Sequence, residues 1–169
     1  MAVGEAVELW EPETGEPAVW ELDTSARNAG ARLTAMAAGG LEQGQVLAAG
    51  DALGWLTVWR PAGQAPRWAA VRWDVGDTVR ALAVATDGGR VLAGGDGGVG
   101  RLWELPLAGG AEAALPPPLG LRGHLDEIIC CALAGEVAAT GGSDGTSMYP
   151  KIPCAVKLFG VPSVSIAWW

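Results

Sequence analysis

Apolar runs of strand length alternate along this chain with short stretches rich in glycine, proline and aspartate. The small residues between the runs supply the backbone conformations that tight turns need. One of the clearest turns is Thr86–Gly89, where Asp87 precedes two glycines. The pattern predicts many short strands, at residues 18–22, 33–37, 46–50, 56–59, 68–73, 78–84, 91–95, 101–103, 127–133 and 137–142.

The strand pattern repeats along the chain. Trp10, Trp59 and Trp103 each close a short run, VELW, LTVW and GRLW, and these tryptophans are separated by 49 and 44 residues. The run VLAAGD at 46–51 returns 45 residues later as VLAGGD, and a related run, VAATGGSD, begins at Val137. A period in the mid-forties, with a glycine–aspartate turn and a tryptophan-ended strand in each unit, is typical of β-propellers, in which every repeat is a four-stranded blade.

The repeats predict an all-β fold, a partial β-propeller of four-stranded antiparallel blades with two full blades and two half-blades. The full blades are expected at 32–73 and 78–121, and the half-blades at 7–22 and 124–146. If the two halves completed one another, the ring would have only three blades, whereas propellers have about four to eight. We therefore expect residues 1–146 to be a piece of a larger propeller. A six-bladed ring made by two chains is the alternative.

Residues 147–169 do not resemble the repeats before them. Both lysines of the chain, its only tyrosine and its only phenylalanine lie here, whereas all arginines and acidic residues come earlier. A blade that stopped between its second and third strands would leave an unpaired edge. We therefore interpret this tail as disordered, or as the product of a different reading frame, a retained intron or a gene-model error. The alternative is an authentic tail whose segment AVKLFG at 155–160 supplies the third strand.

The segment LRGHLDEIICCALAGEVAATGGSDGT at 121–146 resembles the beginning of a WD repeat. It has a Gly123–His124 pair before an apolar strand, then a turn and a small-residue strand. The run that starts at Asp144 and continues with Gly and Thr then enters the next strand, as in the family. These features in this order imply the first half of a propeller blade.

Two further segments resemble other parts of the same repeat. Residues 79–105 resemble its middle and residues 7–17 its end, each with Trp-Glu where the family has Trp-Asp. Three matches in register at one period make residues 7–146 similar to the WD-repeat β-propeller family. The structural repeat positions that this resemblance implies are Trp10, Trp59, Trp103, Gly123, His124, Asp87 and Asp144.

The resemblance also implies a buried, hydrogen-bonded set of four residues in each repeat. Its members are a His before the first strand, a Ser or Thr, an Asp in the first turn and the strand-ending Trp. The chain's only histidine is His124, and the first turn of its own repeat, residues 134–136, has no Asp. The repeat that contains Asp87 and Trp103 has Val75 in place of the His. We therefore expect that no repeat assembles all four residues.

Composition excludes some classes of partner. A net charge of −8 disfavours binding to a phosphate backbone, which requires clustered lysine and arginine. No apolar run is long enough to span a membrane as a helix, and the first residues lack the basic start and apolar stretch of a signal peptide. The three cysteines are sparse and odd in number, which fits a reducing compartment. We expect an intracellular protein, cytoplasmic or nuclear, that binds neither nucleic acid nor membranes.

No group of residues has the spacing of a catalytic, cofactor-binding or metal site. His124 has no second His and no Cys/His/Asp cluster, so we interpret it as a structural loop residue. The glycine-rich run at 95–98 lacks the Gly-Lys-Ser/Thr ending of a phosphate-binding loop and is predicted to be a hairpin turn. Cys130 and Cys131 lie in an apolar strand, where thiols behave as small hydrophobic groups. We expect no catalytic residue, no cofactor and no metal.

The resemblance implies a non-catalytic scaffold that binds other proteins, of unidentified kind, on a rigid ring surface. Interface hot spots favour tryptophan and arginine. Trp55 has no counterpart in the neighbouring repeat and is expected to be exposed. The best candidates for contact with a partner are Trp55, Arg60 and Arg101. Open blade edges also predict self-association.

Two other functional interpretations remain open. Glu13-Thr14-Gly15 followed by Trp20 faintly resembles the repeat signature of quinone-cofactor dehydrogenase propellers, so the chain is alternatively a fragment of that type. The other alternative is a truncated product with no independent function. The repeat pattern predicts the fold in all of these cases, because function depends on sites that are added to a fold.

Overall fold

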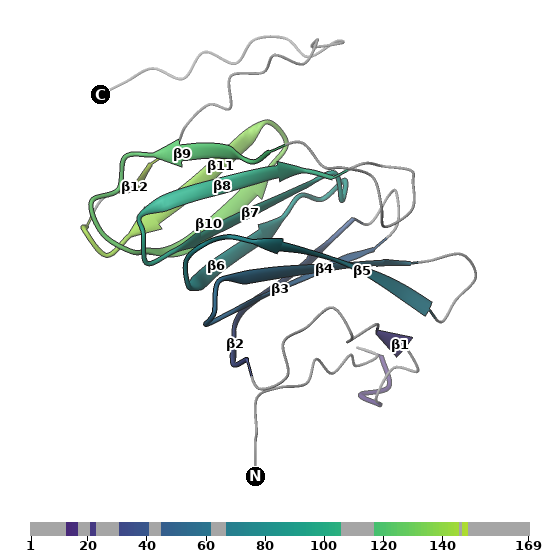
Figure 1. Ribbon diagram of the computed structural model, residues 1–169. Coiled ribbons are helices and arrows are strands. Elements are labelled where there is room, and N and C mark those ends of the chain that lie inside the picture. Colours follow the sequence, from purple (N-terminus) through teal and green to yellow (C-terminus); the bar gives the residue numbers. More distant parts are fainter. Residues whose placement is uncertain are drawn as a thin grey trace, which may run out of the picture.

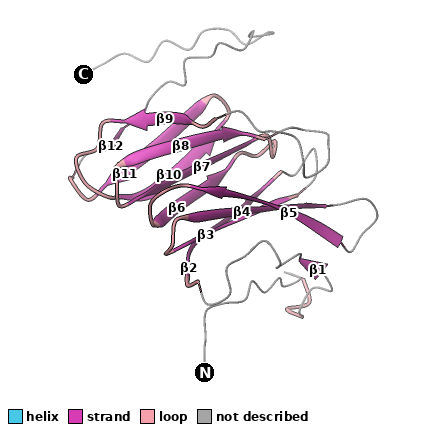
Figure 2. Ribbon diagram, in the orientation of Figure 1, coloured by secondary structure: helices cyan, strands magenta, loops and turns pink. Residues whose placement is uncertain are grey.

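The computed structural model describes residues 13–16, 21–22, 31–40, 45–61, 67–105, 117–145 and 147–148. Every regular element in these ranges is a β-strand (Figure 2). The same ranges contain no helix that is long and apolar enough to cross a membrane. The strands form three sheets that follow one another along the chain (Figure 1). The expected all-β fold is therefore confirmed.

Each sheet is a meander, because strands that follow one another in the sequence pair antiparallel. We call the three sheets the first, second and third blades. The first blade contains β2 (Leu33–Gly39), β3 (Val46–Asp51), β4 (Trp55–Pro61) and β5 (Arg67–Asp74), with β1 (Glu21–Leu22) parallel to β5. The second blade contains β6 (Val79–Val84), β7 (Arg90–Gly95), β8 (Val99–Glu104) and β9 (Leu119–Arg122). The third blade contains β10 (Ile128–Ala134), β11 (Val137–Gly142) and β12 (Ser147–Met148).

The third blade extends past the boundary that the sequence suggested. Ser147–Met148, the first two residues assigned to the tail, pair antiparallel with β11 as β12. The third strand of this blade therefore begins directly after the turn that ends at Gly145. Residues 149–169, which include the alternative third-strand segment AVKLFG, lie outside the described residues.

The predicted half-blade at 7–22 is described only in part. Residues 13–16 form a turn, and residues 21–22 form β1 at the outer edge of the first blade. Trp10, which was expected to end a strand, lies outside the described residues. The existence of a separate half-blade here remains a prediction.

The three blades share one strand register. Leu33, Val79 and Ile128 begin the inner strands β2, β6 and β10, and each is followed by the same bulge, which adds one residue to the inner strand. The turns between the second and third strands end on glycines with positive φ, such as Gly54 at 85° and Gly98 at 65°. These two glycines are 44 residues apart. The second and third strands of the first two blades are therefore 44 residues apart.

This register corrects the equivalence that VLAAGD and VLAGGD suggested. These runs lie 45 residues apart, so aligning them makes Leu47 the counterpart of Leu92. In the structure Leu47 pairs with Trp59, and it is Val91 that pairs with Trp103. Because successive side chains point to opposite faces of a strand, a slip of one residue moves every side chain to the wrong face. The tryptophan spacing, not the apolar run, follows the blades.

Apolar side chains fill the spaces between neighbouring blades. Val58 of the first blade and Trp103 of the second belong to one buried cluster, in which the rings of Trp73 and Trp103 lie 6.3 Å apart. A second cluster joins Leu92 of the second blade to Ala138 of the third. Trp59 and Trp103 are both buried, as expected of residues between blades.

Glycines in the second strands allow the blades to approach closely. A Cβ atom at Gly50 would overlap the side chain of Val79, the first residue of the next inner strand. A Cβ atom at Gly94 would overlap Ile128 in the same way. Each of these two glycines therefore receives the branched side chain that opens the following blade, and we call this contact the glycine seat.

Candidate functional site

The histidine of the third blade belongs to a buried hydrogen-bonded network. The Gly123–His124 pair lies in the loop before β10, Thr140 lies in β11, and Asp144 lies in the turn that follows β11. His124 Nε2 is 3.0 Å from Thr140 Oγ1, and His124 Nδ1 is 3.3 Å from each carboxylate oxygen of Asp144. The side chain of His124 is 2% exposed and that of Asp144 is 9% exposed. The three groups are therefore shielded from water and satisfy one another.

The aspartate that pairs with His124 comes from the turn after β11 and not from the first turn of the repeat. That first turn, residues 134–136, lies at the far end of the β10–β11 hairpin. In an antiparallel hairpin the start of the first strand lies beside the end of the second. The pairing of Ile128 with Gly142 shows this arrangement here. The loop before β10 consequently meets the turn after β11, where Asp144 reaches His124.

The second blade has the strand-ending tryptophan, Trp103, but apolar residues replace the His and Thr of this network. Val75 and Ala93 occupy the positions of the His and Thr in the third blade, and both are buried beside Trp103. Asp87 caps its own turn by accepting a hydrogen bond from the backbone N–H two residues further on, at 2.8 Å. By sequence count, the tryptophan position of the third blade is Pro150. Neither blade therefore combines all four residues.

The order Thr–His–Asp is also that of a hydrolytic triad, in which the His takes a proton from a hydroxyl nucleophile. A nucleophile has to be reached by its substrate. Thr140 is buried and packs against Gly100 of the second blade. In this arrangement the network joins the loop before β10 to the turn after β11 and stabilises both.

Replacing Asp144 with alanine is expected to lower the free energy of unfolding by about 2 kcal/mol, because it removes a charged acceptor from the buried network and from the N–H of Leu125. Urea unfolding followed by far-UV circular dichroism measures this loss. Asp126, an exposed residue of the same loop, provides the matched control, and Asp126→Ala is expected to change stability by less than about 0.5 kcal/mol. Equal effects of the two substitutions would contradict a structural role for the network.

The network holds a loop that presents an apolar side chain to solvent. Asp144 Oδ2 accepts a hydrogen bond of 2.8 Å from the backbone N–H of Leu125, and Leu125 is 94% exposed. Leu53, in the turn between β3 and β4, is also exposed at this end of the blades. We call this end the loop face, meaning the loops before β6 and β10 together with the turns after β3, β7 and β11.

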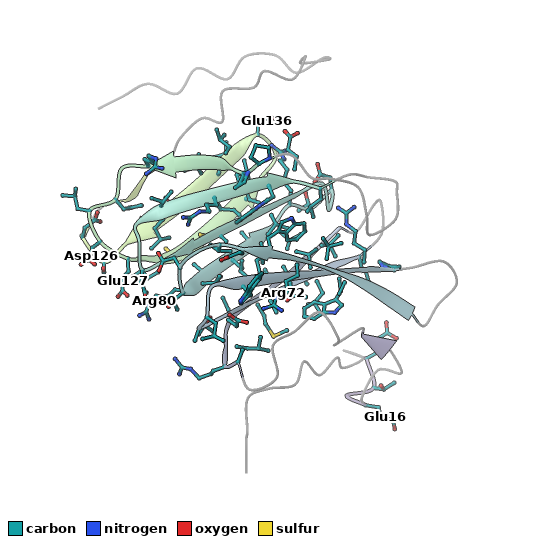
Figure 3. The ribbon with its side chains drawn as sticks, in the orientation of Figure 1. Glu16, Arg72, Arg80, Asp126, Glu127 and Glu136 are labelled. Carbon is teal, nitrogen blue, oxygen red and sulfur yellow. The ribbon has the colours of Figure 1, made fainter. Side chains whose placement is uncertain are left out.

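Several carboxylates lie on the loop face, which also carries Leu125. Asp126 is exposed beside it, and Figure 3 shows Asp126, Glu127 and Arg80 gathered at one end of the molecule. Arg80 forms ion pairs with Asp96 and with Glu127, and its Nε lies 2.9 Å from Glu127 Oε2. The hydrogen bond from Arg80 lowers the pKa of Asp96, so that carboxylate is ionised at neutral pH. Three carboxylates against one guanidinium leave this region negative.

The three residues expected to contact a partner do not form one surface. Trp55 is half-buried rather than exposed, because the guanidinium carbon of Arg72 lies 3.7 Å from the centre of its ring. Arg60 lies at the other end of β4, about 17 Å along the strand. Its Nη2 donates a 2.8 Å hydrogen bond to the carbonyl of Gly88, and burial lowers its pKa. Arg101 lies within β8, in another sheet.

The two adjacent cysteines differ in their surroundings. Cys130 is exposed, whereas Cys131 faces the second blade. Burial, with a smaller contribution from Cys130, raises the pKa of Cys131 to about 12. In the described ranges no three His, Cys, Asp or Glu side chains gather into a group that could bind a metal ion.

The residues of the quinone-type signature are only partly described. Residues 13–16 form a turn in which Thr14 Oγ1 accepts a 3.2 Å hydrogen bond from the N–H of Glu16. Trp20 lies outside the described residues. The turn is stabilised locally, and the quinone interpretation stays untested.

No protein-family model and no curated protein matches the chain. Solved structures do match its fold. The WD40 β-propeller domain of Doa1 matches with a TM-score of 0.58 and 16% identity, over 75% of this chain and 40% of that chain. U3-55K matches with a TM-score of 0.66 and 21% identity, over 89% of this chain and 44% of that chain. The RRP9 WD40 repeats match with a TM-score of 0.57 and 14% identity, over 75% of this chain and 37% of that chain.

These likenesses show that the chain has the fold of a WD40 β-propeller, in the form of a partial ring. The resemblance that the repeat pattern suggested is confirmed at the level of fold. The chain spans less than half the length of each of these three solved chains.

Proposed function

We propose that this chain is a non-catalytic protein-interaction scaffold, part of a longer WD-repeat-like propeller, and that it binds a partner protein through its loop face. Leu125 is the observation that supports this proposal. It is an exposed leucine on a loop that the His124–Thr140–Asp144 network holds from beneath. An apolar side chain on a fixed backbone loses little conformational entropy when it is bound, which favours binding.

The charges around Leu125 define the chemistry of the partner. Asp96, Asp126 and Glu127 create a negative potential that attracts a basic segment and opposes a phosphate backbone. The partner we propose is therefore a basic protein segment with an apolar side chain or pocket that receives Leu125. No cofactor or metal is assigned to this surface.

Other contacts complete the proposal. Trp55, Arg60 and Arg101 are secondary contact candidates, because each is only partly buried. The proposal also includes self-association through open blade edges. It further includes an intracellular location. This chain covers less than half of each of the three solved propellers, which supports the idea that further blades complete the ring.

Selection of random peptides displayed on phage against the immobilised chain tests the loop face. We expect enriched peptides to combine lysine or arginine with an apolar residue. Their affinity should fall by about 30-fold with Leu125→Ser, which corresponds to a hot spot of about 2 kcal/mol. Asp126→Lys should slow their association, because it reverses one of the attracting charges.

Leu119 provides the matched control for this selection. It is an exposed leucine too, but it lies on β9, away from the loop face. Leu119→Ser should leave the affinity of the enriched peptides unchanged. Peptides that bind Leu125→Ser as tightly as the original chain, or a selection with no enriched sequence, would contradict the proposal.

A further inference from the structure

A second leucine projects from the loop face. Leu53 lies in the turn between β3 and β4 and is 64% exposed. One carboxylate oxygen of the buried Asp51 accepts hydrogen bonds from the backbone N–H groups of Leu53 and Trp55, at 2.9 and 3.0 Å. Asp144 holds the N–H of Leu125 in the same way. Both leucines therefore lie on backbone that an aspartate side chain fixes.

Neighbouring loops also hold the turn between β3 and β4. The N–H of Ala52 donates a hydrogen bond to the carbonyl of Arg32 at 2.9 Å, and the hydroxyl of Thr78 donates to the carbonyl of Ala52 at 3.3 Å. The N–H of Val75 donates to the carbonyl of Gly54 at 2.8 Å. The turn is thus bonded to the loop before β2 and to the loop before β6. A ligand that binds this turn does not have to order it first.

The second blade has glycines at the positions of the two leucines. In the turn after β7, the residue at the position of Leu53 is Gly97, which also directly precedes the glycine with positive φ. In the loop before β6, the residue at the position of Leu125 is Gly76, three residues before the inner strand. Both glycines are exposed. The leucines are therefore two separate apolar points, with the glycine-containing loops of the second blade between them.

The loops between the two leucines carry carboxylates. Asp77 follows Gly76 and accepts a hydrogen bond from the N–H of Gly97. Asp96 is exposed in the turn after β7 and forms an ion pair with Arg80. A carboxylate has about four acceptor positions, so both groups can accept further hydrogen bonds. The span between the leucines therefore favours a cationic side chain.

The separation of the leucines determines the length of a segment that reaches both. The second blade packs between the first and the third, and neighbouring sheets lie about 10 Å apart, so the leucines are about 20 Å apart. An extended chain covers about 3.3 Å per residue, which gives about six residues from one anchor to the next. A helix rises about 1.5 Å per residue and would need about 13. The extended segment orders fewer residues and loses less conformational entropy.

We propose that the loop face binds an extended basic peptide segment at two apolar points, with one apolar side chain against Leu53 and a second, about six residues away, against Leu125. A lysine or arginine between these anchors lies opposite Asp77 and Asp96. Arg32 is exposed at the Leu53 end, so the basic residue is favoured between the anchors and not beyond Leu53. This inference rests on the proposed function and adds a second contact residue and the length of the partner's motif.

Synthetic peptides with two leucines and a central lysine pair, in a background of serine and glutamine, test the spacing. Their total length is constant, and the separation of the leucines varies from about 2 to about 14 residues, which includes the extended and the helical solutions. Fluorescence anisotropy measures their affinity for the full chain. We expect the highest affinity near a separation of about six residues. The shortest separation should bind about tenfold more weakly, because it cannot reach both leucines.

Substitution of Leu53 tests the second contact. Leu53→Ser should weaken the best peptide by about tenfold and remove the dependence on spacing, because only Leu125 then remains as an anchor. Leu119→Ser, at an exposed leucine on β9, should change neither property. Circular dichroism checks that both variants fold. Replacing the peptide's lysines with glutamine should lower the affinity and reduce its dependence on salt.

The outcomes distinguish this inference from the proposed function. If Leu125→Ser weakens the peptides but Leu53→Ser does not, the proposed function stands and binding at two points is overturned. An affinity that is highest near a separation of about 13 residues would overturn the extended segment in favour of a helix. If neither leucine affects binding, or if no peptide binds, the loop face is not the binding surface and both proposals are overturned.

Discussion

Replacing Trp103 with alanine is expected to lower the free energy of unfolding by about 3–5 kcal/mol, the largest loss from any single change considered for this chain. The indole is buried between the first and second blades and packs against Trp73. Its removal leaves a cavity that two rigid sheets cannot close, so the cost includes lost contacts as well as lost burial. The measurement is the urea midpoint of unfolding, followed by far-UV circular dichroism.

Trp55 is the matched control for Trp103. It is also a tryptophan in the third strand of a blade, but it is half-buried and touches Arg72 instead of a neighbouring blade. We expect Trp55→Ala to cost about 1 kcal/mol, which corresponds to the loss of a cation–π contact and some burial. If both variants unfolded at the same urea concentration, the space between blades would not be the main source of stability.

The tryptophan spacing predicted the blades because Trp59 and Trp103 face the same side of equivalent strands. The VLAAGD match misled by one residue for a physical reason. Both faces of a blade are covered by neighbours, so valine, leucine and alanine occur on either face and their order carries no information on register. A tryptophan side chain fits only where the space between two blades is large enough, so its position shows which face of the strand points into that space.

The site was only partly predictable from the sequence. His124 and Asp144 were singled out separately, but their contact depends on which ends of β10 and β11 lie side by side. The exposure of Leu125 could not be predicted from the run GHLDE, because the residue type alone does not show whether a leucine is buried. Arg60 was expected at a partner surface, yet it bonds to the next blade. In a repeat protein, a residue's neighbours come from the adjacent repeat as well as from its own.

Placing a side chain on a glycine seat is expected to have the second largest effect. Gly50→Val should lower the free energy of unfolding by about 3 kcal/mol, because its branched side chain would occupy the space of Val79. The first and second blades would then have to move apart, which would also disturb the hydrogen bond between Thr34 and Val79. Urea unfolding of the purified variant measures the loss.

A double-mutant cycle shows whether the seat is the cause. Val79→Ala alone should cost about 2 kcal/mol through the cavity it leaves. In the double variant the new valine would fill part of that cavity. The loss of stability in the double variant should therefore be smaller than the sum of the two single losses by at least about 1 kcal/mol. Gly141→Val is the control at the same register position, where only the rotatable Cys130 side chain is near. A large loss there, or strict additivity of the cycle, would show that strand distortion rather than the contact between blades is responsible.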